Sequence, residues 1–180
     1  MMSSMTPPNR DLVITTPRLT LRATRLSDVP RFVEIQSNWN VTKMLRMAAW
    51  PVIQSEMAEW VTIHPQQWAD GTGYRFAVAR DDMVIGVCDV DEIGNGCGDL
   101  GYWLDEASWG HGFAREAASA VSDFGRRELG LTRFKSGHIA ENAASGKILR
   151  HLGFRPLALE TRYARPRGED VPYRPYVLDN

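Results

Sequence analysis

A glycine turn, Gly110–Gly112, restricts the fold of this chain more than any other segment. A strand-like run, Asp99–Leu104, leads into it, and an amphipathic helical pattern begins directly after it. Glycines let a ligand approach the backbone closely, and the first amides of a helix have no intrahelical partners. Together with the helix dipole, these amides form an anion site. The turn therefore predicts a site that suits a pyrophosphate, although a purely structural tight turn would show the same spacing.

Two common phosphate-binding motifs do not fit this turn. A P-loop needs a Lys followed by Ser or Thr after its glycines, and the chain has neither there. A dinucleotide-binding fingerprint needs three glycines in a parallel βαβ unit near the start of a domain, whereas this turn follows an antiparallel-looking meander past mid-chain. A nucleotide-binding protein is consequently the weakest of the functions considered.

The hydrophobic pattern predicts an α/β domain. Alternating apolar residues indicate strands, and apolar residues three and four apart indicate helices. The expected order is one strand, two helices, three strands, a helix, a strand, a helix and two strands. The predicted strands cover residues 12–22, 74–80, 83–91, 99–104, 133–139, 155–163 and 171–178, the helices begin at Ser27, Ser55, Phe113 and Asn142, and residues 39–51 form an apolar loop or short helix.

Length and composition agree with one globular domain. The chain has 180 residues, of which 43% are hydrophobic and 24% are charged, as is usual for such domains. We expect a flexible tail at residues 1–10 and a single domain at residues 11–180. The sequence has no apolar stretch of about 18 residues and no signal-peptide pattern, so no membrane contact is predicted. Cys88 and Cys97 lack metal-ligand spacing, so we expect no metal and a cytoplasmic protein with reduced thiols.

The net charge of −1 hides an uneven distribution of charged residues. Residues 81–107 carry eight acids and no Lys or Arg, which leaves 21 basic residues against 14 acids, a surplus of seven, in the rest of the chain. The near-neutral total argues against a nucleic-acid partner. The acidic segment is either a solvated hairpin or one wall of a site for a cationic substrate.

Three segments in order resemble the GNAT superfamily of N-acetyltransferases, most closely the branch that acetylates the N-termini of ribosomal proteins. Asp99–Leu104 followed by Trp109–Ala117 is similar to the acyl-CoA-binding motif of that superfamily. Asn142–Phe154 is similar to its second motif, and Thr16–Arg22 is similar to its N-terminal strand. The resemblance covers residues 16–178. Trp109 stands where much of the superfamily has Gln or Arg, but a large residue there is common in this branch.

This resemblance implies a mixed, mostly antiparallel sheet flanked by helices, in which the family's fourth and fifth strands splay apart to admit the pantetheine arm. It implies transfer of an acetyl group from acetyl-CoA to a primary amine by direct attack in a ternary complex. The acceptor would be a protein N-terminus or a small-molecule amine, and the protein a monomer or homodimer. The alternative is a catalytically weak acyl-CoA-binding regulatory module, because the second motif lacks the usual tyrosine: no Tyr occurs between residues 141 and 154.

The resemblance also implies cofactor contacts. The glycine turn would bind the pyrophosphate through its amides, and His111 would add to the phosphate field. A backbone amide freed by a β-bulge near Gly101 would polarise the thioester carbonyl. Asn142 would contact the pantetheine arm, cap its helix, or both. The predicted cofactor-binding residues are Trp103, Leu104, Gly110, His111, Gly112, Phe113, Ala114, Asn142 and Ser145.

Two side chains are predicted to transfer protons. Ser145 stands where this branch replaces the tyrosine, and it would protonate the leaving thiolate or simply cap its helix. Asp99 matches a carboxylate often found at the start of the fourth strand, and it would be a general base or a surface strand-end residue. Glu92 is a weaker candidate base. A modest base suffices for an α-amine, since about a quarter of it is neutral at pH 7.5, against about 0.1% of a lysine.

The acceptor pocket is expected between the apolar loop Trp39–Trp50 and the loop Tyr163–Tyr173. The large side chains that would line this pocket or belong to the core are Met44, Met47, Trp50 and Trp60. The second loop is basic, with Arg162, Arg165 and Arg167. These arginines would either face the solvent or contact the phosphates of the cofactor or an acidic face of the substrate.

Overall fold

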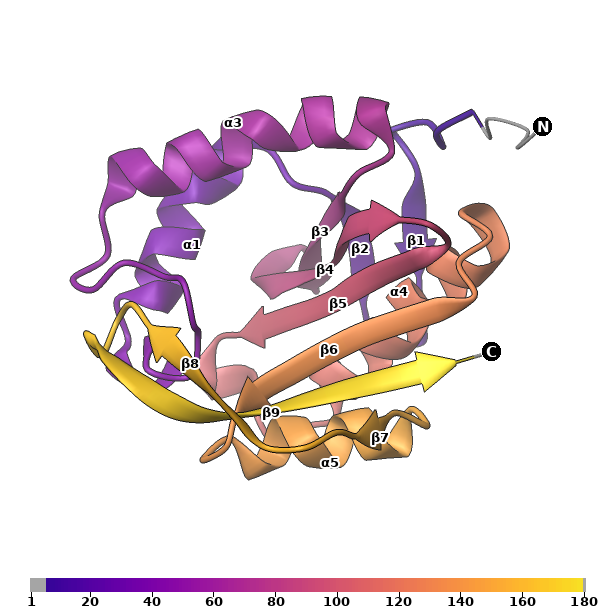
Figure 1. Ribbon diagram of the computed structural model, residues 1–180. Coiled ribbons are helices and arrows are strands. Elements are labelled where there is room, and N and C mark those ends of the chain that lie inside the picture. The colour runs from indigo at the N-terminus through magenta and orange to yellow at the C-terminus, as the bar shows by residue number, and fades with distance from the viewer. Residues whose placement is uncertain (1–5, 180) are drawn as a thin grey trace.

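A nine-stranded mixed sheet forms the centre of the protein (Figure 1). The structure is a computed structural model, and it describes residues 6–179. The strands are β1 (Val13–Thr15), β2 (Thr20–Ala23), β3 (Tyr74–Arg80), β4 (Met83–Gly94), β5 (Cys97–Leu104), β6 (Arg133–Ile139), β7 (Arg155–Pro156), β8 (Glu160–Ala164) and β9 (Glu169–Asp179). The helices are α1 (Val29–Gln36), α2 (Trp39–Thr42), α3 (Gln54–Asp70), α4 (Phe113–Glu128) and α5 (Ala143–His151), with 3-10 turns at Leu26–Asp28 and Glu106–Ser108.

The sheet has the predicted mixed and mostly antiparallel character. Its order is β1-β2-β3-β4-β5-β6-β9-β7, and β8 pairs with β9 outside this path. Every strand pair is antiparallel except β5 with β6. The fold class predicted from the sequence is therefore confirmed.

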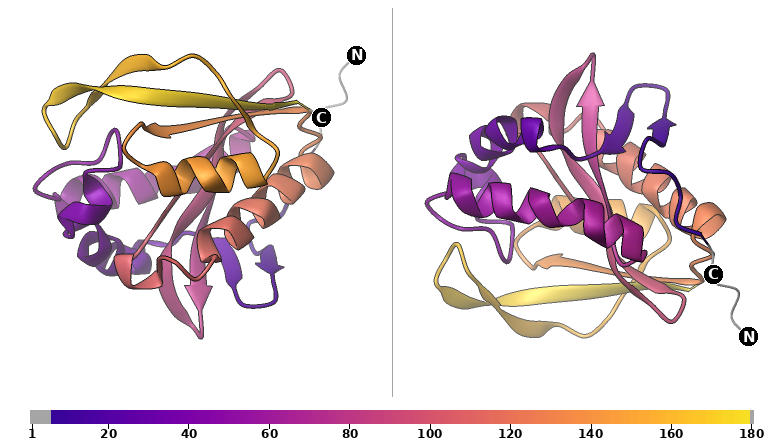
Figure 2. Two further views of the ribbon diagram at one scale, coloured as in Figure 1. Left: turned by 90° about the horizontal axis from the view of Figure 1, so that it is seen from below. Right: turned by 90° about the horizontal axis from the view of Figure 1, so that it is seen from above.

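Helices cover both faces of the sheet (Figure 2). Helices α4 and α5 lie over one face, where Phe76 and Leu149 belong to the larger cluster of buried apolar side chains. Helices α1 and α3 lie over the other face, where Phe32 and Val61 belong to a second cluster. Because side chains alternate along a strand, neighbouring residues of the central strands reach opposite faces and different helices.

The predicted bounds hold for two strands and fail for two others. The strands at Tyr74–Arg80 and Arg133–Ile139 have the predicted ends. The strand predicted at residues 12–22 is instead a hairpin of β1 and β2. Pro17 has no N–H to continue a ladder, and the Thr16 N–H bonds the Leu19 carbonyl at 2.9 Å across the turn. The strand predicted at residues 155–163 likewise divides into β7, which ends at Pro156, and β8.

Strands β5 and β6, which correspond to the family's fourth and fifth strands, pair over three residues only. The pairing runs from Cys97 with Arg133 to Asp99 with Lys135. Beyond that point the two strands diverge toward their C-terminal ends (Figure 1). The predicted splay is therefore confirmed.

The β-bulge predicted near Gly101 is wrong. Pairing between β4 and β5 is unbroken from Asp99 to Leu104, and the irregularity lies farther along, between Asp91 and Gly94 of β4. The glycine serves another purpose, because a Cβ at Gly101 would lie 2.6 Å from Oδ1 of Asp89. Gly101 thus makes room for a buried carboxylate rather than for a bulge.

The predicted tail at residues 1–10 lies partly outside the described residues, and its flexibility stays a prediction. Its described part contacts the domain. The Trp68 indole donates to the Pro8 carbonyl at 2.7 Å, and the Arg10 guanidinium donates to the Thr24 carbonyl.

Residues 6–179 include no helix with the length and apolar character needed to cross a bilayer. They also include no group of three or more His, Cys, Asp or Glu side chains placed to hold a metal ion. Cys88 and Cys97 are free thiols, and burial raises the pKa of Cys88 well above its usual value, which keeps that thiol protonated at neutral pH.

Candidate active site

The divergence of β5 from β6 frees backbone amides at the centre of the sheet. In an antiparallel ladder, alternate residues direct their N–H and C=O groups to alternate sides. The Asp105 N–H bonds the Ile85 carbonyl of β4 at 2.7 Å, so the odd-numbered residues of β5 face β4. Because the ladder is unbroken, the N–H groups of the even-numbered residues Tyr102 and Leu104 point the other way, toward β6. Both residues lie beyond the last β5–β6 pair. The expected free amides therefore arise from splaying, without a bulge.

Side chains satisfy two carbonyls at the edges of this gap. The Ser136 hydroxyl donates to the Leu100 carbonyl at 2.7 Å, where the strands begin to diverge. The Trp109 indole donates to the Leu104 carbonyl at 3.0 Å, at the end of β5. With these carbonyls occupied, Tyr102 offers a backbone donor and acceptor to a ligand in the gap, and Leu104 offers a donor.

The glycine turn lies between the end of β5 and the start of α4. Gly110 and Gly112 have φ of 77° and 80°, the left-handed region that favours glycine. A Cβ added at Gly110 would meet nothing within 4 Å, and residues 110–112 are exposed. Gly112 is the N-cap of the 16-residue helix α4, and no side chain caps it. Exposed, uncapped first-turn amides next to open space fit a pyrophosphate group.

Arg18 holds the glycine turn in place and adds positive charge to it. Its guanidinium donates to the His111 carbonyl at 2.9 Å and pairs with Glu116 at 2.7 Å. It also lies 4.7 Å from the centre of the Phe113 ring, and Arg80 lies 5.0 Å from that centre. Sequence reasoning missed this role, because Arg18 precedes the turn by more than 90 residues and its only signal was the resemblance of its strand.

The predicted cofactor-binding residues around the turn differ in exposure. Phe113 is buried and Ala114 is half-buried, whereas His111 is exposed, with its ring 5.6 Å from that of Phe113. Leu104 is buried at the end of β5 and Trp103 is half-buried. The turn and the strand end therefore lie together, joined by the indole of Trp109.

Ser145 and Asn142 meet at the N-terminus of α5. The Asn142 side chain accepts from the Ser145 N–H at 3.1 Å, as the predicted cap. The buried hydroxyl of Ser145 lies 2.8 Å from the phenol oxygen of Tyr102, and burial raises the pKa of that phenol. A tyrosine hydroxyl thus lies beside the second motif, but it comes from β5. Sequence reasoning named Tyr102 within a motif but gave it no role, because the contact spans 43 residues.

Asp99 lies on the opposite face of β5 from Tyr102. Burial first, and then the negative charges of Asp91, Glu92 and Asp89, together raise the pKa of Asp99 to about 7. Within residues 6–179 the Asp99 carboxylate has no ion pair or side-chain hydrogen bond. A half-buried carboxyl with a pKa near neutrality is suited to accept a proton. The sheet thus places the two predicted catalytic side chains, Asp99 and Ser145, on opposite faces rather than in contact.

The acidic segment 81–107 is partly neutralised by arginines from elsewhere. Arg75 of β3 bonds Asp89 at 2.8 Å and Asp91 at 2.7 Å, and Arg31 of α1 pairs with Asp105. These three acids therefore serve the packing of β3, β4 and α1, and the role of the segment as a wall for a cationic substrate stays a prediction.

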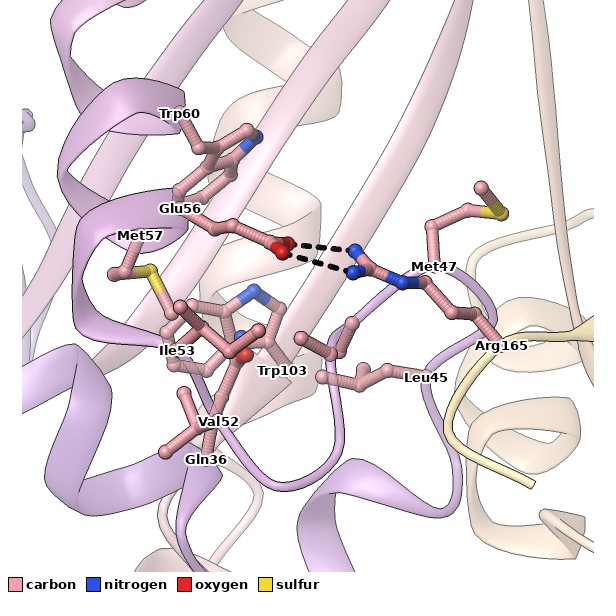
Figure 3. A pocket seen from close by; sticks show the side chains of 12 residues that line it. Gln36, Leu45, Met47, Val52, Ile53, Glu56, Met57, Trp60, Trp103 and Arg165 are labelled. Carbon is pink, nitrogen blue, oxygen red and sulfur yellow. Dashed lines mark hydrogen bonds and ion pairs between the residues drawn. The ribbon is translucent and has the colours of Figure 1, made fainter. Parts of the chain in front are cut away.

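A pocket of about 320 Å³ opens on the α3 face of the sheet, beside Trp103 (Figure 3). Its apolar lining includes Trp60, Trp103, Met47, Met57, Val52 and Ile53. It lies between α3 and the segment 45–53, close to the predicted position. Met47 and Trp60 line it as expected. Trp50 does not line it but packs against Trp39, with ring centres 4.8 Å apart and ring planes tilted by 52°.

Three arginines in β8 and in the turn between β8 and β9 make contacts within the protein, and Arg165 joins that turn to the pocket. Arg165 bonds Glu56 of α3 twice, at 2.7 and 2.9 Å, and its N–H bonds the Arg46 carbonyl at 2.8 Å. Arg167 pairs with Glu141 at 2.7 Å, and Arg162 lies over the ring of Tyr173 at 4.3 Å. Arg167 is largely buried by its contacts, whereas the side chains of Arg162 and Arg165 stay 39% and 41% exposed.

A sheet that splays beside an uncapped helix N-terminus, with a pocket on its far face, is the arrangement of an acyltransferase that uses an acyl-CoA donor. The splay leaves space between β5 and β6, the glycine turn exposes the uncapped end of α4, and a pocket opens on the far face. The fold and the site together define this class.

Comparison with known proteins identifies the family. Residues 18–155 match the acetyltransferase (GNAT) domain family. The chain is 32% identical over 157 residues to an uncharacterized N-acetyltransferase, p20, of Bacillus licheniformis, covering 85% of this chain and 88% of that protein. It is 28% identical over 120 residues to the ribosomal-protein-serine acetyltransferase of Escherichia coli K12, covering 64% of this chain and 67% of that protein. The chain belongs to the GNAT family and is an acetyl-CoA-dependent N-acetyltransferase.

Solved structures share the fold. The ribosomal L7/L12 alpha-N-protein acetyltransferase RimL, in complex with coenzyme A, superposes with a TM-score of 0.81 at 23% identity and covers 93% of this chain and 98% of its own. Mycobacterium smegmatis RimJ, in complex with a CoA-disulfide, superposes with a TM-score of 0.81 at 19% identity. The match covers 89% of this chain and 81% of the RimJ chain. The expected resemblance to the ribosomal-protein branch is thus confirmed for the fold.

Proposed function

We propose that this enzyme acetylates the α-amine of a peptide or protein N-terminus by direct attack in a ternary complex. The observation that carries the proposal is the placement of Asp99 and the Tyr102–Ser145 pair on opposite faces of β5, on either side of the splayed gap. Direct transfer needs a base on the acceptor side and an acid on the donor side. The amine and the thioester would then meet between them.

The donor side would be held by backbone groups. Acetyl-CoA supplies an activated acetyl thioester when bound. The amides of residues 110–114 and the N-terminal dipole of α4 would bind its pyrophosphate, with Arg18 fixing the turn. The Tyr102 backbone would pair with the pantetheine arm in place of the missing β6 partner.

The free N–H groups of β5 would polarise the acetyl carbonyl. A fixed amide donor stabilises negative charge that develops on an oxygen, and removing one such donor typically costs about 10²–10³ in kcat. Tyr102 and Leu104 direct their N–H groups into the gap. Because these amides belong to a central strand that is paired with β4 along its length, the sheet would hold them in place for the reaction.

Ser145 and Tyr102 would return a proton to the leaving thiolate. Their oxygens lie 2.8 Å apart, so a proton given by one hydroxyl can be replaced by the other. Tyr102 meets the chemical need for which the family usually has a tyrosine on the second helix. This contact also weakens the alternative of a catalytically weak acyl-CoA-binding module, which rested on the missing tyrosine.

Asp99 would take the proton from the acceptor ammonium, directly or through water. A base with a pKa near 7 is matched to an α-amine, whose own pKa is near 8, and poorly matched to a lysine near 10.4. The ribosomal-protein-serine acetyltransferase of E. coli, a relative at 28% identity, is named for a protein substrate. Both points favour an N-terminal amine as the acceptor. A cytoplasmic location and a monomeric or homodimeric state stay predictions.

A CoA-release assay tests this proposal. The enzyme is incubated with acetyl-CoA and a panel of peptides, polyamines, free amino acids and aminoglycosides, and the products are identified by mass spectrometry. We expect acetylation of peptide α-amines, with little on lysine side chains of the same peptides. Acetyl-CoA binding without release of CoA on any amine would contradict the catalytic proposal, and a preference for polyamines or aminoglycosides would contradict the peptide acceptor.

A further inference from the structure

The pocket beside Trp103 has the chemistry of a site for an apolar side chain. Its walls come from α3 and the segment 45–53, and they present indole, thioether and aliphatic groups (Figure 3). Large apolar side chains also remain exposed around it, with Met47 exposed by 57% and Ile53 by 44%. Exposed apolar residues grouped around a concave site are typical of a surface that binds an apolar ligand.

The charged groups of this pocket are already paired. Glu56 and Arg165 are joined by two hydrogen bonds of 2.7 and 2.9 Å, and Figure 3 shows the pair bridging α3 and the β8–β9 turn. The Arg165 N–H also bonds the Arg46 carbonyl, so one residue joins three walls. Since Glu56 and Arg165 pair with each other, the pocket offers no free counter-charge to an ionised side chain, although the Gln36 amide also lines it.

Trp103 connects this pocket with the gap where the acetyl group would lie. Its side chain packs edge-on against Phe32 of α1, with ring centres 5.4 Å apart, so it belongs to the α1 and α3 face. Its two chain neighbours, Tyr102 and Leu104, carry the free amides of the gap. Asp99 lies four residues before Trp103 and therefore on the same face. Base, pocket and gap thus share one strand.

The geometry points to a role in acceptor selection, which rests on the proposed function. We infer that this pocket binds the side chain next to the acceptor amine and selects a large apolar first residue, such as Leu, Met or Phe, over Ser. Its volume of about 320 Å³ is at the lower end of the range of ligand pockets, ~300–1,000 Å³. That size is sufficient for one bulky apolar side chain.

The test uses peptides that differ only in their first residue. At saturating acetyl-CoA, kcat/KM is measured for first residues Ser, Ala, Leu, Met and Phe. One methylene group more or less in an apolar pocket changes kcat/KM by roughly 10- to 200-fold, so we expect Leu, Met and Phe to exceed Ser by at least about tenfold. Equal rates, or a preference for Ser or Ala, would overturn the inference while leaving the acetyltransferase proposal intact.

Ala48→Phe places a ring in the pocket, because Ala48 lines it. We expect this variant to reduce the Leu-to-Ala selectivity to near unity. Ala158→Phe makes the same change at an exposed position between β7 and β8 and should keep wild-type selectivity, and thermal melts check that both variants fold. A uniform loss of rate for all peptides in Ala48→Phe, with selectivity unchanged, would also overturn the inference.

A binding measurement separates this inference from the proposed function. Titration calorimetry in the presence of CoA compares the acetylated peptides that begin with Leu and with Ser. We expect the wild type to bind the Leu product at least about tenfold more tightly than the Ser product. Ala48→Phe should bind the two products with similar affinity. If no peptide is acetylated, the proposed function fails. The order of the two binding affinities still tests the pocket: tighter binding of the Leu product supports it, and equal binding contradicts it.

Discussion

The phenol oxygen of Tyr102 lies 2.8 Å from Oγ of Ser145, which joins the central strand β5 to the first turn of α5 across the gap between β5 and β6. Tyr102 also donates toward the Ser145 carbonyl at 3.3 Å. Asn142 fixes the same turn by accepting from the Ser145 N–H. Three hydrogen bonds from two side chains therefore fix the turn that carries the serine hydroxyl, and the reaction would depend on that orientation.

A double-mutant cycle tests whether these two hydroxyls act as a unit. We expect Ser145→Ala to lower kcat by roughly 10²-fold, the lower range for loss of a general acid, and Tyr102→Phe to lower it by about tenfold, with little change in the KM for acetyl-CoA. Because residues acting as a unit are not additive, the double variant should resemble Ser145→Ala. Wild-type turnover in Ser145→Ala would leave that serine a capping role only.

The glycine turn gives a second prediction, concerning donor binding. In Gly112→Val, a branched side chain at φ 80° costs about 1–2 kcal/mol of strain and covers the first-turn amides. We expect the KM for acetyl-CoA to rise by at least about tenfold, the effect of losing one hydrogen bond to a charged group. The acceptor KM should change little.

The control for this variant is Gly71→Ala. Gly71 has a similar φ of 70° at the end of α3, and its added Cβ would make only an ordinary contact with Tyr74. It should lower the melting temperature without raising the KM for acetyl-CoA. An unchanged KM in Gly112→Val would show that the pyrophosphate binds elsewhere.

Sequence patterns predicted the parts of this fold that depend on local periodicity. The strand Tyr74–Arg80 has the predicted ends, because its alternation and the two aspartates that follow it are local signals. The strand predicted at residues 12–22 failed because Pro17 outweighs the alternation around it. The bulge predicted near Gly101 failed because a glycine serves equally to admit a neighbour, here the Asp89 carboxylate.

The features of the site that could not be predicted from the sequence are contacts between residues far apart in the chain. The Tyr102–Ser145 pair spans 43 residues, and the Arg18–His111 bond spans 93. Neither residue pair follows a spacing rule, since each depends on which strand face meets which helix. Asp99 was predicted as a candidate base, but its pKa near 7 arises from burial among other acids, which appears only once the strands are packed.

Arg75 gives a prediction about stability. It is 9% exposed and bonds both Asp89 and Asp91, so Arg75→Met leaves Asp89 buried without a counter-ion. Removing one partner of a buried ion pair typically costs about 3–5 kcal/mol, and urea denaturation should show a loss of this size at pH 7. Arg133→Met, which breaks an exposed pair with Asp179, should change stability little. A similar small change in Arg75→Met would mean that the acids protonate or become hydrated instead.

Asp99 gives the last prediction, in which activity and stability change in opposite directions. The base must be ionised, so kcat/KM should rise with pH up to the Asp99 pKa of about 7 and level off above it. Asp99→Asn should lower the plateau by roughly 10²-fold and remove this inflection. Asp91→Asn should instead move the inflection to lower pH, because the Asp91 charge helps to raise the Asp99 pKa.

The same raised pKa implies that Asp99 destabilises the folded protein above neutral pH. Folding raises the pKa of Asp99 from 3.8 to about 7. The favourable contribution of Asp99 to the free energy of unfolding is therefore complete below about pH 4 and is lost as the pH rises through 7. Asp99→Asn should therefore be more stable than the wild type at pH 8, by on the order of 2–4 kcal/mol, and no more stable at pH 4. Denaturant titrations at the two pH values measure this difference. Equal stability at pH 8 together with an unshifted pH–rate profile would show that Asp99 is an ordinary solvated carboxylate and that the base lies elsewhere.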